Sequence, residues 1–208
     1  MIERLALVQW QSDWPYLVAT FLTGYLMGSI PFGLILGWLA GAGDVRKIGS
    51  GNIGATNVLR TGKKWAAAAT LILDALKGAA AVIAARFYLS LEVFYLLAGL
   101  GAFMGHLFPV WLRFKGGKGV ATFIGIVFAL SLPVGVLTCI SWIVTARAFR
   151  TSSLAALVAA AATPVYFLIF GMTAFSAFVG ILAALIFISH RTNIDRLVKG
   201  QEPRIGVR

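Results

Sequence analysis

The sequence has few charges, few acidic residues and a single cysteine. Only 12% of its 208 residues are charged, about half the share of roughly 25% found in soluble domains, and 60% are apolar. A soluble domain of this length keeps roughly a third of its unfolded surface in water, so it could not hide this much apolar surface. A disordered chain is excluded because such chains are poor in apolar residues. The composition therefore predicts an integral membrane protein.

The scarcity of cysteine, histidine and carboxylates also limits the chemistry. Cys139 has no second cysteine to pair with, so no disulfide can form within the chain, and we expect it to be a small packed residue. The 7 acidic residues and 2 histidines show no grouping typical of a metal site. We therefore expect neither a metal nor another cofactor.

Long apolar stretches, by contrast, are abundant. A helix that crosses about 30 Å of hydrocarbon needs roughly 20 apolar residues, and five stretches approach this length: 15–40, 65–88, 92–108, 153–170 and 174–189. A sixth stretch, 119–149, would make one helix about 46 Å long. Pro133 lies near its middle and removes a backbone hydrogen bond there. Two helices would each be short for a span.

The positive charges decide between one helix and two. Most Lys and Arg residues collect in four segments: 42–64, 106–118, 146–152 and 190–208. Short basic loops usually face the cytoplasm, and only a division of 119–149 into two helices puts all four segments on one face. We therefore predict a single all-α membrane domain, residues 1–208. It is a seven-helix bundle with some short helices, its N-terminus outside and its C-terminus in the cytoplasm.

The first polar segment, 44–60, is rich in glycine. Its glycines fit the G-x-G-x-x-G pattern of dinucleotide-binding folds, but no strand precedes them. Glycine amides can still converge on an anion, and polar side chains stand among them: Ser50, Asn52, Thr56 and Asn57, followed by Arg60, which can grip a phosphate through two hydrogen bonds. A polar turn with inside-facing charge would explain Lys63 and Lys64 but not these residues. The segment therefore predicts an anion site.

The second polar segment, 105–122, places Lys115 and Lys118 on either side of two glycines, just before a predicted helix. The complete P-loop pattern is absent, but this arrangement is still suited to holding a phosphate. His106 lies at the end of the preceding helix, where we expect it to cap the backbone; a catalytic role is the alternative. An intramembrane charge is costly, so Asp74 and Lys77 are expected to pair with each other or with a loop, either as structural support or for chemistry.

The third polar segment, 189–204, contains His190 and Asn193, which share a face if the last helix continues past the membrane. Histidine is well suited to proton transfer near neutral pH. An interfacial histidine followed by a capping asparagine is the alternative. Ser153 lies at a predicted helix start, where it could cap the helix or help to receive an anion.

Together these segments resemble the bacterial membrane acyl-phosphate:glycerol-3-phosphate acyltransferases, the PlsY family. Three motifs carry most of the resemblance: Ser50-Gly-Asn-Ile-Gly-Ala-Thr-Asn57 with Arg60; Gly105-His-Leu-Phe-Pro109 with Phe114-Lys-Gly-Gly-Lys118 and Ala121-Thr122; and His190, Asn193-Ile194, Arg196-Leu197, Gly200 and Glu202. Gly28-Ser-Ile-Pro-Phe32 and Asp74-Ala-Leu-Lys-Gly78 are also similar to family segments. The resemblance thus spans both halves of the chain.

The resemblance implies transfer of a fatty acyl group from acyl phosphate to the 1-hydroxyl of sn-glycerol 3-phosphate, at a cytoplasm-facing site in the bacterial inner membrane. It implies no metal, no cofactor and no nucleic-acid partner. The site residues would be His190, Asn193 and Ser50 for catalysis, with binding by Ser50, Asn52, Thr56, Asn57, Arg60, Lys115, Lys118, Ser153 and Glu202.

Some roles within this site remain open. The base is either His190 or the phosphate of the donor, and Glu202 could orient His190 or a lysine. Asn193 and a loop amide are candidates to stabilise the oxyanion. A transporter or channel for organic phosphates is the competing function; it explains the spans and the Asp74–Lys77 pair, but it would place polar groups near the midplane. A structural or lipid-binding protein would leave the polar motifs without a purpose.

Overall fold

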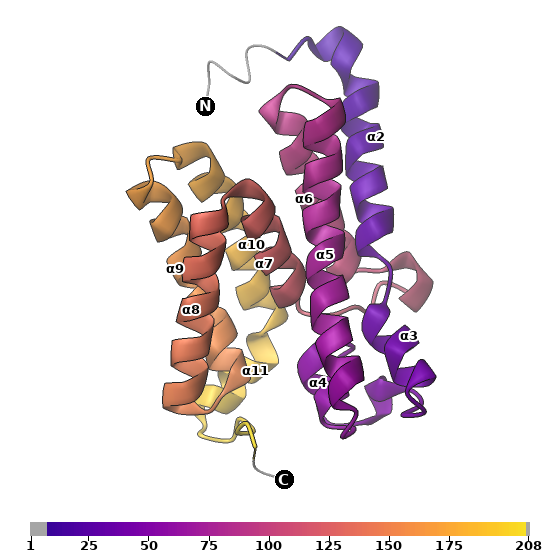
Figure 1. Cartoon of the computed structure of the whole chain (residues 1–208), viewed down its shortest axis with the longest axis vertical. Coiled ribbons are helices and arrows are strands. Elements are labelled where there is room, and N and C mark those ends of the chain that lie inside the picture. Colours follow the sequence, from indigo (N-terminus) through magenta and orange to yellow (C-terminus); the bar gives the residue numbers. More distant parts are fainter. Residues whose placement is uncertain (1–7, 207–208) are drawn as a thin grey trace. The chain divides into compact units, whose positions relative to one another are not determined.

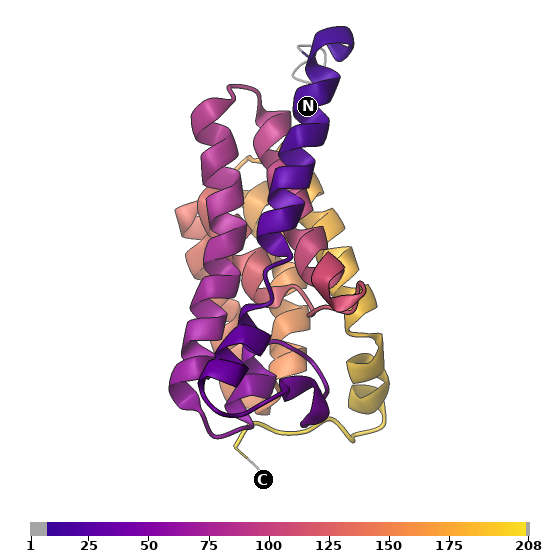
Figure 2. The same ribbon diagram turned by 90° about the vertical axis from the view of Figure 1, so that its right-hand side faces the viewer.

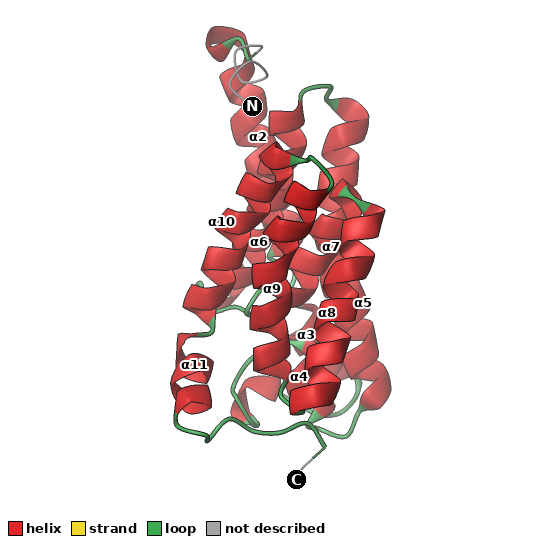
Figure 3. Cartoon of the chain, turned by 90° about the vertical axis from the view of Figure 1, so that its left-hand side faces the viewer, coloured by secondary structure: helices red, strands yellow, loops and turns green. Residues whose placement is uncertain are grey.

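The computed structural model describes residues 8–206, and all regular structure in this range is helical (Figure 3). The residues form two compact units, which meet in the sequence between Ala129 and Leu130. An all-α fold is therefore confirmed for the described residues. The single domain over 1–208 stays a prediction.

The first unit contains eight short or long helical elements among its described residues. They are α2 (Trp10–Gly28), α3 (Phe32–Leu39), η1 (Val45–Lys47), α4 (Ala55–Leu59), α5 (Lys64–Tyr88), α6 (Glu92–Leu107), η2 (Val110–Leu112) and α7 (Val120–Leu130). The second unit contains α8 (Leu132–Phe149), α9 (Ser152–Ile169), α10 (Thr173–Ser189) and α11 (Arg191–Val198).

Within residues 8–206, five helical segments are long and apolar enough to cross a membrane: Ser12–Leu39, Lys64–Tyr88, Glu92–Leu112, Leu132–Phe149 and Ser152–Ile169. The pair α10 and α11, bent by 63°, would be a sixth, and α7 is a shorter apolar helix. These elements describe a multi-pass membrane protein. The count of seven spans and the orientation of the termini stay predictions.

The predicted break in 119–149 is confirmed, but the two helices are unequal. Ser131 has an extended backbone between α7 and α8, and α8 alone has 18 residues, enough for a span. Pro133 stands in the first turn of α8, where a missing N–H interrupts no helical hydrogen bond. The proline therefore starts the second helix, and only α7 is short.

The first apolar stretch forms one candidate span, Ser12–Leu39, as predicted, but its helix is interrupted. Its apolar length predicts one helix over 15–40, whereas α2 ends at Gly28 and α3 begins at Phe32. Figure 2 shows the chain leaving α2 and turning before it enters α3. Pro31 has no N–H to continue the helical ladder. The carbonyl of Ile30 instead accepts a hydrogen bond from Lys77 Nζ at 2.9 Å.

Helices α2 and α6 lie side by side through glycine (Figure 1). A Cβ atom on Gly28 would lie 1.9 Å from the carbonyl oxygen of Ala102, and one on Gly105 would lie 2.1 Å from that of Tyr25. Small residues four apart allow helix backbones to approach this closely in a membrane. The glycines therefore set the position of the helix end that carries the second polar segment.

Hydroxyl groups join the helices of the second unit. Thr138 Oγ1 lies 2.9 Å from Thr163 Oγ1, and Ser141 Oγ lies 2.6 Å from the hydroxyl of Tyr166. Both pairs link α8 to α9, which pack together, and α10 packs on α9 (Figure 3). Such interhelical hydrogen bonds hold helices together where lipid offers no polar partner.

Candidate active site

Asn57 organises the first polar loop. Its amide nitrogen donates to the carbonyl oxygens of Val45 and Asn52, both at 2.7 Å. Its Oδ1 accepts from the backbone N–H of Ser50 at 3.1 Å and from the Ser50 hydroxyl at 3.3 Å. The side chain is 2% exposed, so its entire hydrogen-bonding capacity is used inside the loop.

Arg60 lies against this loop at Gly49. A Cβ atom on Gly49 would lie 2.8 Å from Arg60 Nη1 and 2.6 Å from Asn57 Oδ1. The backbone of Gly49 is also left-handed, with φ of 55°, which favours glycine. Ser50, Thr56 and Arg60 are exposed, and Asn52 is half-buried with its Oδ1 accepting from the N–H of Gly54. The structure thus brings Ser50, Asn52, Asn57 and Arg60 together around the loop before α4, and it places Thr56 in the first turn of that helix.

An apolar patch anchors the loop to the first unit. Val45, Ile53 and Val58 belong to one buried cluster, and Leu112 of the second polar segment packs against it. Gly33 of α3 touches the backbone at Ile53 so closely that a Cβ atom would lie 1.7 Å from that carbonyl oxygen. The first two polar segments therefore share one supporting core.

The second polar loop folds back over the end of α6. The N–H of Gly116 donates to the carbonyl oxygen of Leu107, and that of Gly117 to the carbonyl oxygen of His106, both at 3.0 Å. Lys115 is exposed and Lys118 is half-buried, and α7 begins two residues after Lys118.

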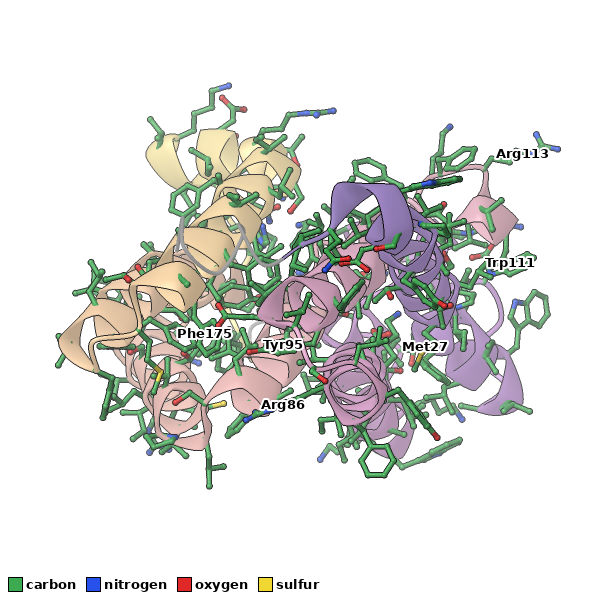
Figure 4. The ribbon with its side chains drawn as sticks, turned by 90° about the horizontal axis from the view of Figure 1, so that it is seen from above. Met27, Arg86, Tyr95, Trp111, Arg113 and Phe175 are labelled. Atoms are coloured by element: carbon green, nitrogen blue, oxygen red, sulfur yellow. The ribbon has the colours of Figure 1, made fainter. Side chains whose placement is uncertain are left out.

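The tip of this loop is exposed and has an unusual backbone. Arg113 and Phe114 have left-handed φ angles of 51° and 60°, which non-glycine residues adopt infrequently. Figure 4 shows Trp111 and Arg113 projecting away from the ribbon. Trp111 and Phe114 are both exposed.

The prediction that His106 caps the backbone is wrong. It is buried within α6, with Nδ1 3.7 Å from Asp74 Oδ1, while its Nε2 edge faces Gly117. Asp74 pairs with Lys77 at 2.7 Å, which confirms the expected intramembrane pair. Lys77 also reaches the loop before α3 through Ile30, so both expected partners of the lysine are present.

Glu202 joins the third polar segment to the start of α9. Its Oε1 accepts from the hydroxyl of Ser153 at 2.8 Å and from the side-chain amide of Asn193. Its Oε2 accepts from Arg196 Nε at 2.7 Å. The sequence suggests His190 or a lysine as the group that Glu202 orients; in the structure its carboxylate binds Asn193, Ser153 and Arg196.

Hydrogen bonding also controls the charge of Glu202. Partial burial alone would raise the pKa of its carboxyl group, but the hydrogen bonds from Asn193, Arg196 and Ser153 favour the ionised form and lower the pKa below its ordinary value. Glu202 therefore carries a negative charge at neutral pH.

In the first unit, the Arg46 guanidinium lowers the pKa of the Asp44 carboxyl to about 2.

His190 lies at the bend between α10 and α11. The helix that the sequence suggests could continue past the membrane is therefore broken at this residue. Its Nδ1 is 2.8 Å from the carbonyl oxygen of Ile186. A carbonyl can only accept, so Nδ1 donates, and in the neutral ring Nε2 is the atom that can take a proton. His190 and Asn193 are both buried, at 3% and 4% exposure.

Ser153 does not cap α9, since the capping position is Thr151 and no side chain bonds there. The Ser153 hydroxyl instead donates to Glu202, so the helix start does receive an anion, although it comes from the chain itself. Sequence reasoning misses one member of this network as a site residue, Arg196, which forms an ion pair with Glu202. The placement of Arg196 and Glu202 on either side of Gly200 is the available signal.

The predicted site residues thus form two groups. Those of the first and second motifs lie in the first unit: Ser50, Asn52, Thr56, Asn57, Arg60, Lys115 and Lys118. Those of the third motif lie with Ser153 in the second unit: Ser153, His190, Asn193 and Glu202. Between residues 8 and 206, no three His, Cys, Asp or Glu side chains lie close enough to hold a metal ion.

Comparison with known proteins identifies the relatives of this chain. The family model described as glycerol-3-phosphate acyltransferase matches residues 18–200. Curated relatives of that name include one from Rhodopseudomonas palustris (strain HaA2), 57% identical over 91% of this chain and 95% of its own length. Another, from Jannaschia sp. (strain CCS1), is 57% identical over 90% of this chain and 92% of its own length.

Solved structures agree with these relatives. A crystal structure of PlsY, an integral membrane glycerol 3-phosphate acyltransferase in its glycerol 3-phosphate form, superposes with a TM-score of 0.86 at 36% identity, covering 91% of this chain and 96% of that one. The lysophosphatidic acid form gives 0.84 at 35% identity, with 91% and 95% covered. The motifs, the all-helical membrane fold and these matches agree: the chain belongs to the PlsY family of glycerol-3-phosphate acyltransferases.

Proposed function

We propose that this protein transfers a fatty acyl group from acyl phosphate to the 1-hydroxyl of sn-glycerol 3-phosphate. The observation that carries the proposal is the likeness, over nine-tenths of the chain, to PlsY structures in glycerol 3-phosphate and lysophosphatidic acid forms. The substrate and product named there fit two loops that carry glycine amides, Arg60 and lysines. A basic face also concentrates anionic substrates.

The reaction has a simple balance. The hydroxyl oxygen of glycerol 3-phosphate attacks the carbonyl carbon of the acyl phosphate, and a tetrahedral oxyanion forms. Collapse of this intermediate breaks the bond between the carbonyl carbon and the phosphate oxygen. The products are lysophosphatidic acid and inorganic phosphate, and the hydroxyl proton goes to a base. Because acyl phosphate is an activated mixed anhydride, the chain needs to supply only positioning, charge stabilisation and proton transfer.

In the first unit, we assign phosphate binding to the loop amides with Ser50, Arg60, Lys118 and Lys115. Asn57 is buried and engaged by the loop, so we expect it to act on the substrate through Ser50 and Asn52. Thr56 is exposed in the first turn of α4, next to Asn57 in the sequence, and is a further contact for the substrate.

In the second unit, His190 is the proposed proton acceptor, because its Nδ1 is committed to Ile186 and its Nε2 can take the proton. Asn193 is the proposed oxyanion donor, held by Glu202. Ser153 shares that carboxylate and lies at the start of α9. We propose that the reaction takes place at the cytoplasmic face of the bacterial inner membrane, where short basic loops usually lie.

The test is direct synthesis. Purified protein in detergent is given a fatty acyl phosphate and labelled glycerol 3-phosphate, and we expect labelled lysophosphatidate and phosphate in equal amounts. Replacing the donor by acyl-CoA tests the choice of donor, and we expect no product. Absence of lysophosphatidate, with uptake of glycerol 3-phosphate into sealed proteoliposomes, would overturn the proposal in favour of transport.

A further inference from the structure

A cluster of three buried ionisable side chains lies between the first and the second polar loop of the first unit. Asp74, Lys77 and His106 lie inside the first unit with 3%, 6% and 3% of their surface exposed. Burying charged groups in a membrane protein is costly and usually has a functional reason. The proposed reaction gives none of the three a chemical role.

The contacts of the cluster lead to both loops. Lys77 binds Asp74 at 2.7 Å and donates to the carbonyl oxygen of Ile30 in the break before α3. Helix α3 supports the first loop, because Gly33 touches the backbone at Ile53. On the other side of Asp74, the His106 ring stands between that carboxylate and the second loop.

The contact between His106 and the second loop is very close. If Gly117 carried a Cβ atom, it would lie 2.1 Å from His106 Nε2, and the three nearest atoms would all belong to this ring. The φ angle of Gly117 is not left-handed, so it is not the backbone conformation that requires glycine there, and the nearest obstacle to a side chain is the imidazole. Lys118 follows directly, and its place depends on where Gly117 lies.

We propose that His106 is a positioning residue. Its imidazole, in contact with Asp74 on one side, fixes the distance between Gly117 and α6 and thereby places Lys118 for a substrate phosphate. This inference rests on the proposed function. It makes His106 necessary for substrate binding without contact with the substrate. It also explains why the glycine at position 117 cannot be enlarged while the histidine is present.

Enlarging residue 117 and shrinking residue 106, separately and together, tests the proposal. Gly117→Ala pushes the ring away, and His106→Ala removes the ring; each is expected to lower kcat/KM by about 10- to 100-fold, since a misplacement of about 1 Å can cost 10²-fold. The double variant His106→Ala with Gly117→Ala lacks the ring whose atoms are the three nearest obstacles to the methyl group. Its kcat/KM should lie within about twofold of that of His106→Ala alone, instead of falling to the product of the two losses.

Gly116 provides the matched control. A Cβ atom there would meet the carbonyl oxygens of His106 and Leu107 and the ring of Pro109, at 2.2 to 2.6 Å. The His106 side chain is not among these neighbours, so His106→Ala should bring no relief to Gly116→Ala. A relief of equal size at both glycines would show general loosening and overturn the proposal.

Kinetics separate positioning from simple stability. Loss of a correctly placed lysine should raise KM for a phosphate-bearing substrate more than it lowers kcat, and His106→Gln, which keeps a nitrogen near Gly117, should recover much of the affinity. A cycle whose effects multiply, or variants that lower only the melting temperature with KM unchanged, would overturn the role of His106. A wild-type protein that forms no lysophosphatidate would instead overturn the proposed function.

Discussion

The helices within the first unit and the helices within the second unit pack by different kinds of contact. In the first, α2 and α6 meet backbone to backbone at glycines, as at Gly28 and Ala102. In the second, α8 and α9 meet through hydroxyl pairs such as Thr138 and Thr163, and a Cβ atom added to Gly180 in α10 would have no neighbour within 4 Å. Close approach and hydrogen bonding are two of the means by which helices associate in lipid.

The same contrast extends to the candidate site. The first unit offers loops whose glycine backbones approach neighbouring side chains, as Gly49 approaches Arg60 and Gly117 approaches His106. The second unit offers a carboxylate, Glu202, that gathers three side-chain donors. Adding atoms should therefore damage the first unit most, whereas removing polar atoms should damage the second.

The largest effect is expected at His190. If its Nε2 takes the hydroxyl proton, His190→Ala should lower kcat by at least about 10²-fold, the usual contribution of a general base. Steady-state kinetics with acyl phosphate and glycerol 3-phosphate measures this. A loss below about tenfold would mean that the donor phosphate is the base and that His190 only positions the substrates.

Gly28→Ala tests the close packing of the first unit. The methyl group would collide with the carbonyl oxygen of Ala102, and overpacking of this kind costs about 1–3 kcal/mol or more. Thermal unfolding in detergent should show a clear loss of stability. Gly180→Ala is the matched control, and it should be neutral or slightly stabilising because alanine favours a helix over glycine. Equal losses in the two variants would remove the contrast between the units.

Glu202→Gln tests the polar network of the second unit. Losing the charge weakens the bonds from Asn193, Ser153 and Arg196, at a cost of about 1.5–3 kcal/mol for a charged hydrogen-bonded group, and kcat should fall because Asn193 is released. The exposed pair of Asp195 and Lys199 is the control, and Asp195→Asn should change stability by less than about 1 kcal/mol.

The same variant has a pH signature. Because the folded-state pKa of Glu202 is lowered, its stabilisation is present above the ordinary pKa of 4.5 and is lost as pH falls through the folded-state value. The melting temperature of the wild type should therefore fall more in acid than that of Glu202→Gln. Parallel curves for the two proteins would contradict the network.

A smaller effect is expected from Arg60→Lys. The guanidinium can bind a phosphate through two parallel hydrogen bonds, whereas lysine provides a point charge. KM for glycerol 3-phosphate should rise about tenfold with kcat nearly unchanged. Unaltered kinetics would remove Arg60 from the site.

The smallest effect is expected at Asp44, which binds the exposed Arg46. Asp44→Asn should lower stability by less than about 1 kcal/mol. Since the pKa of Asp44 is lowered to about 2, the wild-type contribution is present above pH 3.8 and is lost as pH falls through about 2. A large change in activity would mean that this turn does more than support its loop.

Much of the fold could be predicted from the sequence because membrane helices carry a strong local signal. Apolar length identifies α5, α6, α9 and α10 to within a few residues, and Pro133 marks the division between α7 and α8. The break at Ser29-Ile30-Pro31 escapes this reasoning, because the apolar stretch continues through it. What stabilises that break is Lys77, which lies far along the chain.

The motifs could likewise be found without coordinates, but the roles of several residues could not. Asn57 stands among predicted ligands, yet its amide is used by Val45, Asn52 and Ser50. Ser153 has the sequence position of a helix cap, and its hydroxyl binds Glu202. A side chain's partner depends on distance in space, which spacing in the chain does not supply.

The sequence by itself determined that this protein lies in a membrane, that it is helical, and where most helices and the glycine-rich motifs are. These features depend on the composition and pattern of short stretches of the chain. Only the tertiary structure decided which polar side chains are used to build the loops. Buried polar groups must find partners wherever the chain brings them, so the connections of Asp74 to His106 and of Glu202 to Asn193 arise from folding.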